Sequence, residues 1–330
     1  MKVTLLGGTG TLGAALAERL YGKADVTCFS RGELAQKTLA ARFPDVRMVI
    51  GDVRDRDAVA RVLKGADVAF LLSAIKHVEV AEANPVEAIK TNVIGAINVG
   101  EAAMAAGLSH VVYSNTDKAV LPIPTYGYTK ALAQNYLLTL NNEGATRFSA
   151  FNWGNIVASR GSVIQTFVTR LQQGAVVPIT HPEMSRFWLT IDAAADFMLA
   201  NYKRAPTDRA LIPDVKAATV VRVVASIARI LGVTKYALAN TGLRGTEKIH
   251  EVLESTHAGC IRSDTCPQYS DDELDLLLTP IITRLADDSP QEAPDRRLSR
   301  NNGAALHGNP SKTRDRAAPR GRGRTAAQGF

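Results

Sequence analysis

The glycines near the start of the chain constrain its fold most. An apolar run over residues 3–6 leads directly into Gly7, Gly10 and Gly13, and helix-period residues follow. Glycine permits a tight strand-to-helix turn and lets backbone N–H groups approach a pyrophosphate at the positive end of the helix. The GxxGxxG spacing differs from GxGxxG, and an ordinary tight turn is the alternative interpretation. The position between a strand and a helix favours a dinucleotide site.

Apolar runs of strand length alternate with segments of helical period through the first half of the chain. This alternation predicts βαβ units and an α/β fold, a Rossmann-type doubly wound parallel sheet with helices on both faces. Strands are expected at residues 3–6, 25–28, 47–50, 68–72, 110–113 and 149–152. Crossover helices are expected at residues 12–21, 56–63 and 87–106, where apolar residues recur at three- and four-residue spacing.

The alternation loosens after about Gly161 into helices with short extended pieces. This change predicts a smaller mixed α/β cap beside the sheet. We expect residues 1–160 to bind the cofactor and carry the catalytic residues. Residues 161–285 are expected to bind substrate, with sheet and cap elements intermixed, and residues 286–330 to form a disordered basic tail.

The net charge of +7 belongs mostly to the end of the chain. Residues 291–330 contain nine Lys or Arg against three acids, a net +6, so the first 290 residues carry only +1. The tail has too few large apolar residues to offset the entropy of ordering itself. Its RGRGR run at 320–324 could contact a polyanion, but a solvated extension is the favoured interpretation, and nucleic-acid binding is not expected of the rest.

Apolar runs and cysteines point to a soluble protein. No run approaches the roughly 20 residues of a membrane helix, and glycines interrupt the apolar N-terminus, which argues against a signal peptide. Cys28, Cys260 and Cys266 are odd in number and lack CxxC spacing, so they support neither a disulfide framework nor a zinc site. We therefore expect a cytoplasmic location and no metal.

The end of the second expected strand bears on the choice of cofactor. An NAD enzyme usually has an acid there for the ribose 2′-hydroxyl, whereas this chain has Ser30 and Arg31. A hydroxyl and a guanidinium suit a 2′-phosphate, so NADP is preferred, with NAD still possible and a solvated arginine as the alternative. Asp52 and Val53 follow the third strand, where the carboxylate could accept a hydrogen bond from the adenine amino group.

A YxxxK pair follows the fifth expected strand. Residues i and i+4 share one face of a helix, so the Lys130 ammonium could lie near the Tyr126 phenol and favour the phenolate. Tyr126 would then act as a base, and Thr116 could donate to the same substrate oxygen. Tyr128 lacks a lysine four residues later. YxxxK also occurs by chance on helix surfaces, but the glycine turn upstream favours a catalytic pair.

These motifs resemble the extended short-chain dehydrogenase/reductases, and among them the soluble UDP-N-acetylglucosamine 4,6-dehydratases that invert C5. The resemblance covers about residues 1–277. It rests on GGTGTLG (7–13), FSRGEL (29–34), GDVRD (51–55), IKHVEVAEANPVEAIKTNVIGAINV (75–99), TDKAV (116–120), YGYTK (126–130), GNIVASRGSVI (154–164), PIT (178–180), SRFWLT (185–190) and EKIHEVL (247–253). The chain departs from the family pattern at Asn152-Trp153, where relatives have Arg-Tyr, and at Gly245-Thr246, where they have Pro-Gly.

The resemblance implies an NADP-dependent hydro-lyase that acts on UDP-GlcNAc in polysaccharide biosynthesis. Tyr126 would take the 4-hydroxyl proton as the C4 hydride passes to the nicotinamide. Lys118 would remove the C5 proton, provided that burial or neighbouring cations lower its pKa. Protonated Asp117 would donate to the departing 6-hydroxyl. The hydride would return to C6, and reprotonation of C5 on the opposite face would invert it. The expected product is UDP-2-acetamido-2,6-dideoxy-β-L-arabino-hexos-4-ulose.

The resemblance also implies the two binding sets and a homo-oligomer. The expected cofactor residues are Gly7, Thr9, Gly10, Thr11, Leu12, Gly13, Ser30, Arg31, Asp52, Val53, Ala74, Lys76, Asn92, Tyr126 and Lys130. The expected UDP-sugar residues are Lys76, Asn155, Arg160, Ser162, Val163, Thr180, Arg244 and Glu247. His77 could be structural or could face the ligand.

Two other functions remain open at this point. A UDP-HexNAc 4-epimerase needs Thr116, Tyr126 and Lys130 but no acid–base pair at C5 and C6, so Asp117 and Lys118 would then be only an exposed ion pair of a turn. An NADP-sensing protein without enzymatic activity would not need Tyr126 and Lys130. Membrane-bound retaining dehydratases carry methionine in place of this tyrosine, so Tyr126 favours inversion.

Overall fold

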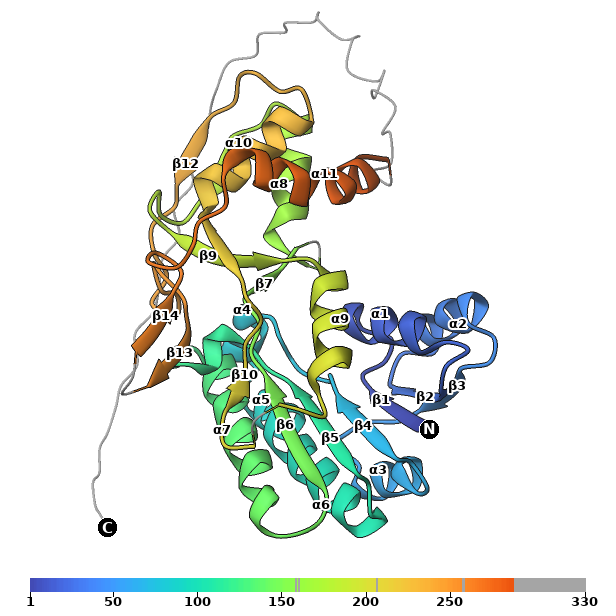
Figure 1. Cartoon of the computed structure of the whole chain (residues 1–330). Helices are drawn as coiled ribbons and strands as arrows, with labels where there is room; N and C mark the ends of the chain where they lie inside the picture. Colours follow the sequence, from blue (N-terminus) through green and yellow to red (C-terminus); the bar gives the residue numbers. More distant parts are fainter. Residues whose placement is uncertain (158, 160, 206, 257–258, 288–330) are drawn as a thin grey trace, which may run out of the picture. The chain divides into compact units, whose positions relative to one another are not determined.

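The protein was analysed as a computed structural model, which describes residues 1–157, 159, 161–205, 207–256 and 259–287. The described residues belong to one compact unit. Its main sheet has seven parallel strands in the order β10-β6-β5-β4-β1-β2-β3 (Figure 1). The strands are β1 (Lys2–Leu6), β2 (Asp25–Ser30), β3 (Arg47–Ile50), β4 (Val68–Leu71), β5 (His110–Ser114), β6 (Arg147–Phe151) and β10 (Ala210–Leu211). The predicted doubly wound α/β fold is confirmed.

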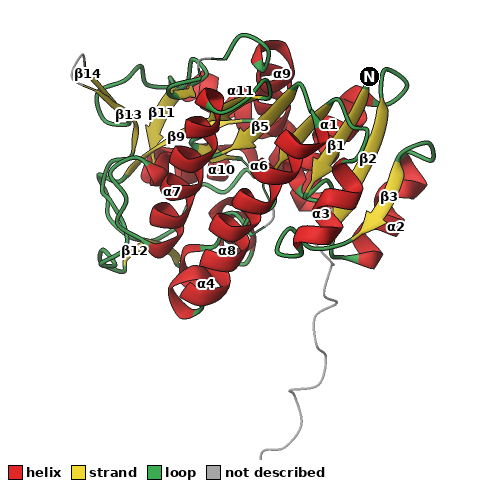
Figure 2. Cartoon of the chain, turned by 90° about the horizontal axis from the view of Figure 1, so that it is seen from below, coloured by secondary structure: helices red, strands yellow, loops and turns green. Residues whose placement is uncertain are grey.

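Helices cover both faces of this sheet (Figure 2). Neighbouring residues of one strand enter opposite cores: Leu5 packs with α1 (Thr11–Leu20), α2 (Glu33–Arg42) and α9 (Ile191–Asn201), while Leu6 packs with α3 (Arg56–Leu63), α6 (Gly95–Ala106) and α7 (Thr125–Thr139). Side chains alternate across a strand, so a central strand needs apolar residues at every position. This explains why the parallel strands read as continuous apolar runs.

The predicted helix over residues 87–106 is interrupted. It divides into α5 (Pro85–Ala88), a π-helix η1 (Ile89–Ile94) and α6, and α4 (Val78–Ala83) precedes them. The side chain of Asn92, within the π-helical turns, bonds to both Ile75 backbone groups and to Thr129. π-helical turns recur at functional sites, and this one supports the loop after β4. The spacing of apolar residues does not distinguish a continuous α-helix from one that contains a short π-helical segment, so the sequence did not predict this interruption.

The second half of the chain contributes both to the main sheet and to the cap. β10 adds the seventh strand beside β6, and α9 packs on α1. The other elements are η2 (Asp117–Ala119), η3 (Leu140–Asn142), β7 (Asn155–Ile156), α8 (Val163–Gln172), β8 (Val177–Ile179), β9 (Ser185–Leu189), β11 (Lys216–Thr219), α10 (Val220–Ile230), β12 (Leu238–Asn240), β13 (Val252–Thr256), β14 (Gly259–Arg262) and α11 (Asp271–Asp287). Helices α8, α10 and α11 share a separate apolar core with β8 and β9.

Two further expectations concern the ends and surface of the molecule. Helix α11 extends to Asp287, two residues into the expected tail, and the rest of that tail lies outside the described residues. Within the described part of the chain, no helix combines the length and apolar character needed to cross a bilayer.

Candidate active site

The glycine turn between β1 and α1 is shaped by close backbone contacts. Gly7 has a φ of +94°, and a Cβ there would lie 2.7 Å from the Ser73 backbone nitrogen. A Cβ on Gly13 would lie 2.5 Å from the Gly8 Cα, so α1 can pack against the turn only without a side chain at residue 13. Gly10, the N-cap, leaves the helix N-terminus uncovered by a side chain. These features fit the pyrophosphate of a dinucleotide.

A cavity of about 910 Å³ opens at the carboxyl ends of the central strands, beside this turn. Most of the predicted cofactor, catalytic and substrate residues line it. They are Gly7, Thr9, Gly10, Thr11, Leu12, Gly13, Ser30, Arg31, Asp52, Val53, Ala74, Lys76, Thr116, Lys118, Tyr126, Lys130, Asn155, Ser162 and Val163. The cavity lining does not include Asn92, Asp117, Thr180, Arg244 or Glu247, and Arg160 lies outside the described residues.

The end of β2 presents a cation rather than an acid. Arg31 is exposed and lies 3.8 Å from a carboxylate oxygen of Asp52, which also binds Arg54 at 2.6 Å. Partial burial raises the pKa of Asp52, but the hydrogen bonds and charge of Arg54 outweigh this and hold it below its ordinary value. The Ser30 hydroxyl accepts a hydrogen bond from Gln36 at 3.0 Å. The Arg31 guanidinium thus lies at the cavity margin with only a distant partner carboxylate.

Tyr126 and Lys130 lie in the first turns of α7, and both are buried. Lys130 donates to the Ser114 carbonyl at 2.6 Å and lies 4.0 Å from the centre of the Tyr113 ring. Burial lowers the pKa of Lys130 to about 7 and raises that of Tyr126 to about 12. Lys118 and Thr116, rather than the predicted Lys130, are the groups that lower the pKa of Tyr126. Lys130 instead donates its hydrogen bond to the Ser114 carbonyl.

Asp117 and Lys118 form an ion pair on η2, shortly after β5, in which Asp117 is buried and Lys118 half-buried. Thr116 caps η2: its hydroxyl accepts from the Lys118 backbone at 3.3 Å and donates to Asp117 Oδ1 at 2.9 Å. Lys118 Nζ lies 3.0 Å from the same Oδ1, while buried Oδ2 has no hydrogen-bond partner among the described residues. Only 1% of the Asp117 side chain is exposed, so this is not the exposed ion pair of an ordinary turn.

Burial dominates the electrostatics of this pair. It raises the pKa of Asp117, and nearby Glu251 raises it further, against the lowering effect of Lys118. Burial lowers the pKa of Lys118, but Asp117 and Glu251 outweigh burial and hold it above its ordinary value. The condition for Lys118 to act as a base, a pKa lowered by burial or neighbouring cations, is therefore not met in this structure, because two carboxylates flank the ammonium.

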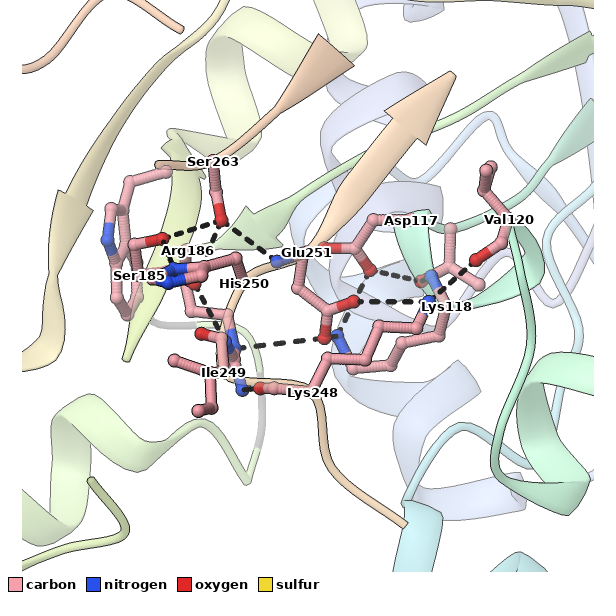
Figure 3. A network of polar contacts seen from close by, with 12 residues as sticks. Asp117, Lys118, Val120, Ser185, Arg186, Lys248, Ile249, His250, Glu251 and Ser263 are labelled. Atoms are coloured by element: carbon pink, nitrogen blue, oxygen red, sulfur yellow. Dashed lines mark hydrogen bonds and ion pairs between the residues drawn. The ribbon is translucent and has the colours of Figure 1, made fainter. Parts of the chain in front are cut away.

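Glu251 connects the C-terminal part of the chain to this pair (Figure 3). Its side chain is 3% exposed, and Oε1 lies 3.3 Å from Lys118 Nζ. Arg186 Nε lies 3.8 Å from the same oxygen, and Lys248 Nζ lies 3.8 Å from Oε2. Lys248 also donates to the Val120 carbonyl at 2.6 Å. The Asp117–Lys118 pair is therefore part of a cluster of five buried or half-buried charges.

The N-terminus of α8 faces the other side of the cavity. Ser162 is its N-cap, but the side chain makes no capping bond, and its buried Oγ has no partner among the described residues. A helix N-terminus with an unused hydroxyl suits a phosphate. Gly161, with a φ of +73°, would place a Cβ 2.5 Å from the His77 ring, so His77 lies against this turn.

Three of the predicted substrate residues lie away from the cavity lining. Arg244 binds Glu79 of α4 at 2.5 Å, and its backbone nitrogen donates to Glu247 at 3.2 Å. Thr180 directly follows β8.

Of the residues that depart from the family pattern, Asn152 is buried and donates to the Leu253 carbonyl at 3.3 Å, while Trp153 lines the cavity and donates to Ser114.

The sequence profile of the polysaccharide biosynthesis protein family matches residues 3–269. The chain belongs to this family. It is similar to the UDP-N-acetylglucosamine 4,6-dehydratase (inverting) of Campylobacter jejuni, with 34% identity over 77% of this chain and 78% of that protein. It is also similar to the UDP-glucose 4-epimerase of Rickettsia felis, with 33% identity over 76% and 77% of the two chains. The X-ray structure of Pen from Bacillus thuringiensis superposes with a TM-score of 0.79, at 28% identity, over 84% of this chain and 97% of that one.

Sequence reasoning about this polysaccharide biosynthesis protein missed Glu251, Lys248 and Arg186. All three lie in segments that carry the family resemblance, EKIHEVL and SRFWLT, but neither segment indicates where its charged side chains point. One signal was available. Glu251 directly precedes the apolar pair Val252-Leu253, and an acid beside buried strand residues needs a cationic partner.

Proposed function

We propose that the protein is a UDP-N-acetylglucosamine 4,6-dehydratase that inverts C5, an enzyme of the hydro-lyase class. The observation that carries this proposal is the pair of buried Asp117 and half-buried Lys118 beside Tyr126. A reaction confined to C4 has no use for a second acid–base pair. The similarity to the inverting dehydratase of Campylobacter jejuni supports the same assignment.

We further propose NADP as the cofactor. A nicotinamide cofactor accepts a hydride from C4 and returns one to C6. Gly7, Gly10 and Gly13 would hold its pyrophosphate at the start of α1, and Asp52 would accept from the adenine amino group. Arg31 supports NADP over NAD, because a guanidinium at the end of β2 suits a 2′-phosphate and no acid is present there for a 2′-hydroxyl.

Oxidation at C4 would use Tyr126 as the base. Its pKa of about 12 describes the buried phenol without ligands, so it needs further cationic support to ionise. Thr116 and Lys118 already lower this pKa, and the positive charge of an oxidised nicotinamide would act in the same direction. Lys130, anchored on the Ser114 carbonyl, would orient the nicotinamide ribose.

Elimination across C5 and C6 would use the Asp117–Lys118 pair. One proton moving from Lys118 Nζ to Asp117 Oδ1, over 3.0 Å, converts the ion pair into a neutral amine and a neutral acid without changing the net charge. The amine then takes the C5 proton, and the acid protonates the departing 6-hydroxyl, which leaves as water. The pair ends as an ammonium and a carboxylate. After the hydride has returned to C6, protonation of C5 from the opposite face would give the inverted product.

The UDP part of the substrate would lie between the β-sheet and α8. The Ser162 hydroxyl and the N-terminus of α8 support a diphosphate position there, with Asn155 beside it. Arg244, Glu247 and Thr180 would reach the uridine only if the cap closes over the substrate, because they do not line the cavity of this structure.

The second candidate is a UDP-HexNAc 4-epimerase. It is favoured by the similarity to the Rickettsia epimerases and by the presence of Thr116, Tyr126 and Lys130. Incubation of the protein with UDP-GlcNAc and NADP, followed by mass spectrometry, separates the two. Loss of one water from the sugar supports the dehydratase, whereas conversion to UDP-GalNAc at unchanged mass supports the epimerase.

We also propose that the protein is a cytoplasmic homo-oligomer. Exposed apolar side chains on α5, η1 and α7, namely Val86, Ile89, Tyr128 and Leu132, support self-association through helices that flank the sheet. The three unpaired cysteines are compatible with a reducing compartment. Light scattering on the purified protein tests the oligomer: a monomer mass at micromolar concentration would contradict it.

A further inference from the structure

The Lys118 ammonium has two carboxylate neighbours and one face toward the cavity. Nζ lies 3.0 Å from Asp117 and 3.3 Å from Glu251, and Lys118 also lines the cavity. An ammonium has three N–H positions around one C–N bond. Two carboxylates that occupy two of these positions direct the third toward the substrate. Asp117 alone, the adjacent residue in the chain, would leave the long lysine side chain free to rotate.

Hydrogen bonds of its backbone hold Glu251 in place independently of Lys118. Its backbone nitrogen donates to Ser263 Oγ at 2.9 Å, and its carbonyl accepts from the Ser263 backbone at the same distance. Arg186 holds the preceding segment by donating to the Lys248 and Ile249 carbonyls at 2.9 Å each. The Glu251 carboxylate therefore comes from a rigid support, which a positioning role requires.

The charged and titratable groups around Glu251 and the Asp117–Lys118 pair come from η2, β9, α7 and the segment that precedes β13. Lys118 and Asp117 face it from η2, Arg186 from β9 and Lys248 from its own segment, while Tyr126 of α7 faces the pair. Arg186 donates mainly to backbone carbonyls, and Lys248 to the Val120 carbonyl. Lys118 lies closest to the Glu251 carboxylate among its cationic partners.

We propose that Glu251 is a positioning residue of the Asp117–Lys118 pair, which fixes Lys118 Nζ toward C5 of the sugar and, by its charge, keeps a proton on the pair. Only the identity of the target atom, C5 of the sugar, rests on the proposed dehydratase function. The geometric part, a carboxylate that holds Lys118 and increases its proton affinity, applies to any reaction in this cavity.

Glu251→Gln in the full-length protein tests the catalytic part, with Glu254→Gln as the matched control. Glu254 lies on β13, is half-buried, and among the described residues has one ion-pair partner, Arg209 at 3.9 Å. With UDP-GlcNAc and NADP, we expect Glu251→Gln to slow water loss by on the order of 10²-fold, mostly in kcat, because a misplaced reacting group costs about that much. Formation of reduced nicotinamide in the first turnover stays within about threefold of wild type.

The pH profile separates positioning from simple loss of structure. Removing the Glu251 charge lowers the proton affinity of the pair, so the acid limb of the kcat profile moves to lower pH in Glu251→Gln. Glu251→Asp keeps the charge and recovers most of the wild-type pH profile. Its rate of water loss should lie between those of wild type and Glu251→Gln. Equal loss of nicotinamide reduction and water loss, with an unshifted pH profile, would overturn the proposal.

Amine acylation of Lys118, followed by mass spectrometry, tests the geometric part without any substrate. We expect Glu251→Gln to increase the labelling rate of Lys118 near neutral pH by about tenfold, because only the neutral amine reacts. Glu254→Gln leaves it unchanged. If wild type releases no water from UDP-GlcNAc but labelling behaves as expected, the proposed function fails and the positioning role stands. Unchanged labelling in Glu251→Gln overturns the role. If that variant does not fold, Glu251→Asp withdraws the carboxylate from Lys118 by one methylene, and we expect a smaller increase in labelling, about two- to threefold, against Glu254→Asp.

Discussion

Lys118 Nζ lies 3.0 Å from Oδ1 of Asp117, in a carboxyl group that has almost no contact with solvent. A single proton can therefore occupy either member of the pair at constant net charge, so one pair can supply both the base for C5 and the acid for the C6 hydroxyl. Two independent residues would each need a pKa shifted far from its ordinary value. The adjacency of Asp117 and Lys118 on one short turn is thus part of the proposed mechanism.

Lys118→Met removes the base for C5. We expect water loss from UDP-GlcNAc to fall by about 10³-fold or more, while NADP binding and reduced nicotinamide in the first turnover persist. Stopped-flow absorbance and product NMR check this result. The exposed Lys90→Met is the control. A Lys118→Met enzyme that still interconverts UDP-GlcNAc and UDP-GalNAc at the wild-type rate would support the epimerase instead.

Asp117→Asn removes the acid but preserves its shape. We expect water loss to fall by about 10²–10⁴-fold, because the 6-hydroxyl departs without a proton donor. Lys118 can no longer pass its proton to residue 117, so exchange of the C5 proton with solvent after C4 oxidation should slow as well, while reduced nicotinamide still forms in the first turnover. NMR in deuterated water detects both events. C5 exchange at the wild-type rate, in a variant that binds NADP normally, would contradict proton transfer within the pair.

Arg31→Ala tests the cofactor assignment. Loss of a charge-assisted hydrogen bond costs about 1.5–3 kcal/mol, so NADP affinity should fall by about 10- to 100-fold. NAD affinity should change by less than about threefold, since NAD lacks the 2′-phosphate. Titration calorimetry with both cofactors gives the ratio, and Arg56→Ala, an exposed arginine at the start of α3, is the control. An equal decrease for both cofactors would contradict 2′-phosphate recognition.

Gly13→Ala tests the shape of the glycine turn. The added Cβ would lie 2.5 Å from the Gly8 Cα, so the turn or α1 must move. We expect a loss of about 1–3 kcal/mol in the free energy of unfolding and weaker cofactor binding. Denaturant titration measures the first, and calorimetry the second. Gly144→Ala meets only the flexible end of Met104 at 3.3 Å and should leave both unchanged.

Lys130 makes stability depend on pH in a specific window. Its pKa of about 7 in the folded chain lies below its ordinary value of 10.5, so between these pH values the unfolded chain binds more protons. The free energy of unfolding of the cofactor-free protein should therefore rise from pH 7 toward pH 10, by up to a few kcal/mol from this residue. Denaturant titrations of wild type, Lys130→Met and the exposed control Lys37→Met check this: only Lys130→Met should lose the rise.

The first half of the fold followed from local patterns. The central strands read as apolar runs because both faces of the sheet are covered, as Leu5 and Leu6 illustrate. The glycine turn and the YxxxK pair were identifiable because each is complete within a few adjacent residues. By contrast, β10 is too short to be recognised from its own sequence. Its place beside β6 depends on the path of the whole second half.

The charge environment of the site could not be predicted in the same way. Glu251 reaches Lys118 through a contact between segments that are distant in the sequence, and the direction of the Lys118 pKa depends on that contact. Likewise, the spacing of Tyr126 and Lys130 predicts that they share a helix face, but not that Lys130 bonds to Ser114. Spacing determines which residues can meet, whereas tertiary packing determines which of them do.

In the proposed reaction, this chain eliminates water across C5 and C6 of the sugar and inverts C5. The most direct test is incubation of the protein with UDP-GlcNAc and NADP in deuterated water, with the sugar followed by NMR. We expect a 4-keto-6-deoxy product that carries deuterium at an inverted C5. A UDP-GalNAc product without deuterium at C5, or a 4-keto product with retained C5 configuration, would contradict it.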